Sequence, residues 1–116
     1  MQYMLLIYTD EAATPPPKPG EAVSFSPAYV AYTQALHEAK VWRAGDRLQP
    51  ISTATTVRMV NGRSEVLNGP YAETREQLGG YYLIDVPDLD AALSWAARCP
   101  AASRGHVEVR PLWKMP

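Results

Sequence analysis

The carboxylate best placed for acid–base chemistry is Asp85, near the end of a β-rich segment at residues 81–86. Tyr81, Leu83 and Asp85 occupy alternate positions, so a strand through this segment places all three on one face. A carboxylate among apolar neighbours keeps its proton to a higher pH unless a cation is paired with it. We therefore predict that Asp85 is either a catalytic acid or base or one partner of an ion pair.

A second candidate carboxylate, Glu73, lies in the segment that follows a predicted turn. Asn68-Gly69-Pro70 is typical of a tight turn, because glycine allows positive φ and proline fixes the direction in which the chain leaves. Two interpretations stay open for the residues that follow. They form either a flap that brings Tyr71 and Glu73 to a cleft, as loops on rigid scaffolds often do, or a turn whose charges are simply solvated.

The other reactive residue types indicate neither a metal site nor an activated nucleophile. His37, Cys99 and His106 show none of the spacings typical of metal ligands. Cys99 precedes Pro100 at the end of a predicted helix, where no helix N-terminus is present to activate a thiol. We predict no metal, no cofactor and a structural role for Cys99.

The strands that must position these residues follow from the pattern of apolar side chains. They are expected over residues 3–8, 54–60, 63–67, 81–86 and 106–112. Asn61-Gly62 stands between the second and third of them and predicts a hairpin, since both turn positions need positive φ. The first and fourth strands are apolar on both faces except at Asp85.

Two helices are expected between these strands. Ser26-Pro27 reads as an N-cap followed by the first helical residue, and this helix is predicted to run to about Lys40 or Trp42, with Gly45 ending the segment. The second helix is expected to start with Asp88 as its N-cap and to end at Cys99-Pro100.

The order strand, helix, strands, helix, strand predicts an α+β fold of the ferredoxin-like, split βαβ type, with an antiparallel sheet and an added β-hairpin. The chain of 116 residues fits a single domain, residues 1–116. Two helices cover only one face of the sheet, whereas the strands at 3–8 and 81–86 are apolar on both. A symmetric homodimer, sheet against sheet, is therefore expected to cover the second face.

The composition of the chain restricts the classes of binding partner and the cellular compartment that we expect for it. The formal net charge of −1 argues against a nucleic-acid partner, which demands a concentrated basic surface. No apolar run approaches the length of a membrane span, and the opening residues do not resemble a signal peptide. With Cys99 as its single cysteine, the protein is expected in the reducing cytoplasm.

Residues 68–86, from Asn68-Gly69-Pro70 to Asp85-Val86, resemble the signature of the YCII-related, DGPF-domain family. Shorter segments that also resemble it lie at residues 3–8, 48–50, 54–58, 95–98 and 108–111. The resemblance implies a dimeric α+β barrel of ferredoxin-like subunits. Relatives with this barrel include small-molecule isomerases and dehalogenating enzymes, and genes of the family often neighbour those of extracytoplasmic-function sigma factors.

The sequence departs from the family pattern at three positions, and these departures change which residues could act as an acid or a base. Asn68 stands where the signature has Asp, so this side chain cannot serve as an acid or base at neutral pH. Tyr71 replaces the signature Phe. Shorter family members carry a His–Asp pair whose His matches Tyr29 here, so that pair is not carried over.

The sequence thus predicts a cytoplasmic homodimer whose barrel encloses a small-molecule cleft for binding or catalysis. Asp85 and Glu73 are the candidate catalytic residues. The candidate ligand-binding residues are Tyr8, Tyr29, Asn68, Tyr71, Tyr81 and Arg110. The alternative is a protein-interaction module that acts with a sigma factor or another regulator, which an exposed apolar patch around Trp95 or in the loop at residues 15–19 would favour.

Overall fold

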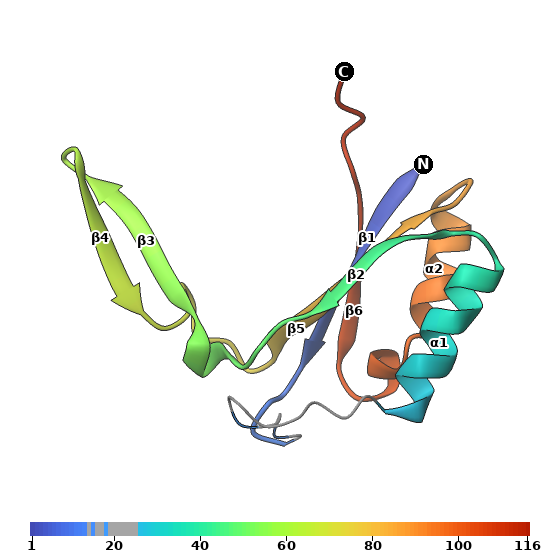
Figure 1. The fold of residues 1–116 in the computed structure, drawn as a ribbon, viewed down its shortest axis with the longest axis horizontal. Helices are drawn as coiled ribbons and strands as arrows, with labels where there is room; N and C mark the ends of the chain where they lie inside the picture. Colours follow the sequence, from blue (N-terminus) through green and yellow to red (C-terminus); the bar gives the residue numbers. More distant parts are fainter. Residues whose placement is uncertain (14, 16–17, 19–25) are drawn as a thin grey trace.

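The computed structural model describes residues 1–13, 15, 18 and 26–116 (Figure 1). Its helices are α1 (Pro27–Glu38) and α2 (Leu89–Arg98), with short 3-10 turns η1 (Ile51–Thr53) and η2 (Pro100–Ser103). Its strands are β1 (Gln2–Thr9), β2 (Trp42–Arg47), β3 (Thr55–Val60), β4 (Arg63–Asn68), β5 (Gln77–Asp85) and β6 (His106–Pro111).

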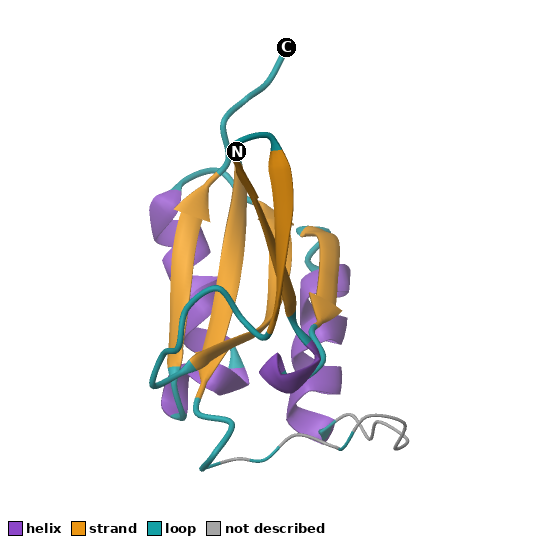
Figure 2. Ribbon diagram, turned by 90° about the vertical axis from the view of Figure 1, so that its left-hand side faces the viewer, coloured by secondary structure: helices purple, strands orange, loops and turns teal. Residues whose placement is uncertain are grey.

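The main sheet of the described chain is antiparallel, with the strand order β2-β5-β1-β6. Helices α1 and α2 lie side by side on one face of this sheet, as both views show (Figures 1 and 2). This arrangement is the predicted α+β, ferredoxin-like fold, which is confirmed.

The core fills the space between the sheet and the helices. Every second residue of β1, namely Tyr3, Leu5 and Ile7, is buried there, as the two-residue period of a strand requires. Tyr32 and Leu36, one helical turn apart on α1, pack against them. Both expected N-caps are confirmed, because the side chains of Ser26 and Asp88 accept hydrogen bonds from the first turns of α1 and α2.

The opposite face of the sheet, which we call the open face, carries the alternate residues. Met4, Leu6 and Tyr8 of β1 lie there next to Tyr81 and Leu83 of β5. These side chains are only partly buried, and no helix or strand in the described part of the chain covers them. The expectation that these strands are apolar on both faces is thus confirmed.

The region after α1 differs from the prediction. The helix ends at Glu38, Lys40 adopts a left-handed φ of 60°, and residues 42–47 form β2 instead of a helix tail closed by Gly45. The sequence of β2 contains no β-branched residue, and it is extended because it pairs with β5. Gly45 has a packing role instead, since a Cβ there would lie 2.8 Å from the rings of both Trp42 and Tyr82.

The hairpin of β3 and β4 projects away from the sheet (Figure 1), and in the described structure these strands pair only with each other. Its predicted turn is confirmed, because Asn61 and Gly62 have φ values of 50° and 78°. Val57, Met59 and Val66 share one face of this hairpin, and each is more than 60% exposed.

Among the described helices, none is long and apolar enough to cross a membrane.

Candidate functional site

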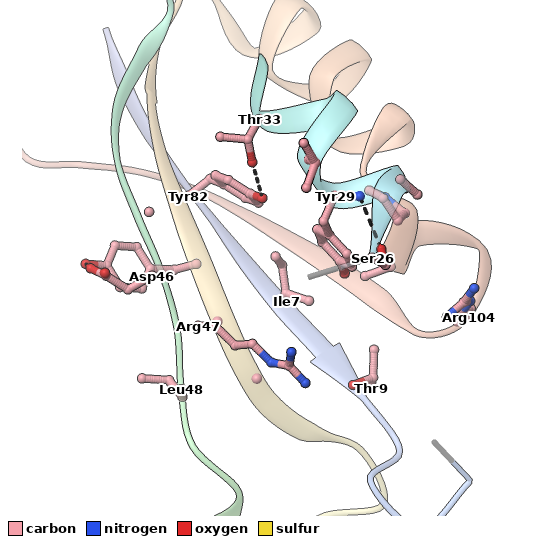
Figure 3. A pocket seen from close by; sticks show the side chains of 18 of the residues that line it. Ile7, Thr9, Ser26, Tyr29, Thr33, Asp46, Arg47, Leu48, Tyr82 and Arg104 are labelled. Carbon is pink, nitrogen blue, oxygen red and sulfur yellow. Dashed lines mark hydrogen bonds between the residues drawn. The ribbon is translucent and has the colours of Figure 1, made fainter. Parts of the chain in front are cut away.

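A cavity of about 590 Å³ opens between the first turn of α1 and the helix-covered face of the sheet. Ile7, Tyr29 and Tyr82, which Figure 3 labels, are apolar or aromatic residues of its wall, and Trp42 is a further one. A volume of this size and an apolar wall with a few polar groups are typical of sites for small molecules. The cavity is therefore the candidate functional site of the described chain.

Glycines in β2 and β5 shape this cavity. Gly45 lies beneath the rings of Trp42 and Tyr82, as described above. At Gly80 a Cβ would lie 2.8 Å from the main-chain oxygen of Asp46. Neither position accepts a side chain without displacing part of the cavity wall, so both glycines are needed for its shape.

The two tyrosine hydroxyls inside the cavity, those of Tyr29 and Tyr82, keep their protons at neutral pH. The hydroxyls of Thr33 and Tyr82 share a hydrogen bond of 3.0 Å. Burial raises the pKa of Tyr29 to about 12, with a smaller contribution from the neighbouring Cys99 thiol. Burial also raises the pKa of Tyr82, although the bond with Thr33 opposes this. At neutral pH both tyrosines are therefore hydrogen-bond donors, not bases.

Positive charge lies at the mouth of the cavity. Figure 3 shows the side chain of Arg47 extending from β2 toward Thr9 of β1, and Arg104 lies at the opposite rim. Within the described residues, neither guanidinium forms an ion pair with a carboxylate. Of the carboxylates that line the cavity, Asp46 accepts a 2.7 Å bond from the Tyr81 hydroxyl, and Glu11 accepts one of 3.2 Å from the amide of Ile51.

The structure brings only some of the predicted ligand-binding residues to this cavity. Tyr29 and Tyr81 are among its lining residues, although the Tyr81 side chain lies on the open face, where its hydroxyl donates to Asp46. Tyr8 and Arg110 lie on the open face instead, where Arg110 is paired with Glu108 of the same strand.

The candidate catalytic carboxylates lie elsewhere. Asp85 is paired with the amino group of Met1 at 3.2 Å and with Arg43 at 3.5 Å, which is the ion-pair alternative of the prediction. Asn68, Tyr71 and Glu73 are exposed near the base of the hairpin, and Tyr71 is 91% exposed. The positive φ expected for the turn is present at Gly69, with a value of 126°. None of these residues lines the described cavity.

Sequence reasoning missed Arg47, Arg104 and Thr33. The sequence pattern does not point to Arg47, because it does not predict β2, the strand that carries this residue. A signal was available, since Arg47 stands two residues after Gly45, and glycine within a strand often marks a close approach or a ligand. In the described chain, no group of three or more His, Cys, Asp and Glu side chains is arranged to hold a metal ion.

The raised pKa of Tyr29 predicts a loss of stability in alkali. The pKa of Tyr29 is about 10 in the unfolded chain, the ordinary value for tyrosine, and about 12 in the folded chain. Between these two pH values the unfolded chain releases the Tyr29 proton, whereas the folded chain keeps it. The free energy of unfolding is thus expected to fall as the pH rises through this window, and to fall less steeply in Tyr29→Phe. Urea unfolding at a series of pH values measures both slopes. Equal slopes in the two proteins would contradict the prediction.

The fold and the cavity define a ferredoxin-like α+β domain with a hollow between its first helix and its sheet. The YCII-related domain matches residues 1–116, so the chain belongs to the YCII-related family. The chain is similar to an uncharacterized protein of Rhizobium meliloti (strain 1021), with 40% identity over 114 residues. The match covers 97% of this chain and 92% of that relative, and it assigns no activity.

Proposed function

We propose that this protein is a homodimer that binds a small organic molecule in the cavity beneath α1. The observation that carries the proposal is the 590 Å³ cavity itself, with its apolar wall and its protonated tyrosine hydroxyls. The geometry supports binding better than acid–base catalysis, because Asp85 and Glu73 both lie outside the lining. The cytoplasm remains the expected location.

The homodimer is supported by the open face. Met4, Leu6, Tyr8 and Leu83 form an apolar strip whose side chains are only partly buried in the single chain. A second copy related by twofold symmetry would cover this strip and give the α+β barrel expected for the family. The dimer would leave the cavity accessible, because the cavity opens on the helix-covered side of the sheet.

The alternative function, a module that docks on a sigma factor, has no support from Trp95, one of the two places where the sequence predicts an exposed apolar patch. Trp95 is half-buried, with its ring 6.2 Å from that of Tyr32 and the Arg98 guanidinium 4.3 Å above it. It therefore does not form the exposed patch that would favour docking. Most of the proline-rich loop at residues 15–19 lies outside the described residues.

Ala28→Trp is expected to block ligand binding, because Ala28 lines the cavity on the first turn of α1 and an indole there would occupy its mouth. A suitable probe is a naphthalene carboxylate titrated into the labelled protein and followed by NMR. We expect the shifts of cavity residues in the parent to be lost in this variant. Ala31→Trp is the matched control, since Ala31 is an exposed residue of the same helix that does not line the cavity. Equal binding by both variants, or no binding by the parent, would refute the proposal.

A further inference from the structure

We propose that the ligand of this cavity is a small organic acid with a flat apolar body, whose carboxylate binds Arg47. This inference rests on the proposed ligand-binding function and adds the chemical class of the ligand. It follows from three features of the site: a guanidinium at the mouth, the charges around it, and the rings of the wall.

The first feature is the position of Arg47. In the pairing of β2 with β5, Arg47 stands opposite Gly80, which has no side chain. The Arg47 side chain therefore crosses over β5 toward Thr9, and its guanidinium ends above the cavity (Figure 3). Arginine presents a planar pair of donors that matches a carboxylate, and the forked geometry makes such pairs stronger than neutral hydrogen bonds.

The second feature is the charge around the mouth. Arg104 adds a second cation at the rim, and the positive N-terminal end of α1 lies over the cavity at Ser26 (Figure 3). The Asp46 carboxylate is bonded to Tyr81 and points to the other side of the sheet. Glu11 is the one carboxylate of the lining left near the mouth in the described chain, and it is bonded to the Ile51 amide. The described charges therefore favour an anion.

The third feature is the wall below the guanidinium. Tyr29, Trp42 and Tyr82 offer ring surfaces, and Ile7 adds an aliphatic contact. Rings pack well against other flat apolar groups, whereas a strongly hydrated body such as a sugar would lose hydrogen bonds there. An acid bound with its carboxylate at the mouth and its ring in the cavity satisfies both ends of the site.

The test compares a naphthalene carboxylate with its neutral carboxamide, which has the same shape and no charge. The parent protein is expected to bind the acid at least about tenfold more tightly than the amide, as measured by NMR titration. Arg47→Gln should remove this preference by weakening the acid alone. Arg63→Gln on the distant hairpin is the control for the change in net charge, and it should bind the acid like the parent.

Each outcome bears on a different claim. If acid and amide bind the parent equally and Ala28→Trp abolishes both, the cavity binds ligands but the inference of an acid is wrong. If neither probe binds, the proposed function itself fails. Thermal melting establishes that Arg47→Gln is folded, and if it is not, Arg47→Lys, which keeps the charge but loses the paired donors, provides the second variant. A preference for the acid that survives in full in the Arg47 variant that folds would overturn the inference.

Discussion

Gly105→Ala is expected to lower the free energy of unfolding by about 3 kcal/mol, the upper end of what over-packing usually costs. A Cβ at Gly105 would lie 2.0 Å from the main-chain oxygen of Tyr8 and 3.2 Å from the Cα of Thr9. These are backbone atoms of the central strand β1, so no side-chain rotation relieves the overlap. The end of β1 must move away from the start of β6, and urea unfolding measures the cost.

Gly79→Ala is the matched control for this substitution. A Cβ at Gly79 has the hydroxyl oxygen of Thr9, 4.0 Å away, as its nearest neighbour, which is an ordinary contact. Alanine there is expected to leave stability unchanged or to raise it by up to about 1 kcal/mol, because it restricts the unfolded chain. If both variants unfold like the parent, the close approach of Gly105 to β1 is not a constraint in solution.

Leu6→Lys is expected to convert the proposed homodimer into a monomer. Leu6 lies in the middle of the apolar strip on the open face, and a lysine there would place a charge in the centre of the interface. Burial of an unpaired charge costs several kcal/mol, and twofold symmetry introduces it twice. Light scattering should give twice the 12.8 kDa chain mass for the parent and a single chain mass for the variant.

Leu93→Lys separates this effect from a general response to surface charge. Leu93 is a leucine of α2 that is 47% exposed on the helix side of the molecule, away from the open face. This variant is expected to keep the mass of the parent. A parent protein with the mass of one chain at micromolar concentration would contradict the dimer directly.

Local signals made much of the fold predictable. Ser26 and Asp88 mark helix starts because a cap depends only on the residues of the next turn. Asn61-Gly62 marks the hairpin because the turn depends on two residues alone. The strand β2 was missed because its extended form comes from pairing with β5, a segment some 35 residues later in the chain, as the contact of Asp46 with Tyr81 shows.

The candidate site was harder to predict because the sheet has two faces that the sequence pattern does not distinguish. The sequence predicts Tyr8, Arg110 and Tyr29 as polar residues of one cleft, yet Tyr8 and Arg110 lie on the open face, whereas Tyr29 of α1 lines the cavity. The space beneath α1 depends on Gly45 and Gly80 and on where the helix sits over the sheet. Those are tertiary properties, so composition and periodicity carry little information about them.

The strand order β2-β5-β1-β6 has a consequence for synthesis of the chain. Of the described strands, β1 is made first, and it is paired on both sides with the two that are made last, β5 and β6. While the rest of the chain is being made, β1 has neither of its hydrogen-bonding neighbours, although both of its faces are apolar. The β3–β4 hairpin closes locally within microseconds, whereas the main sheet must wait for the C-terminal third of the chain. The core therefore cannot close until β5 and β6 have been made, and the nascent strand β1 is the segment that a chaperone would need to shield.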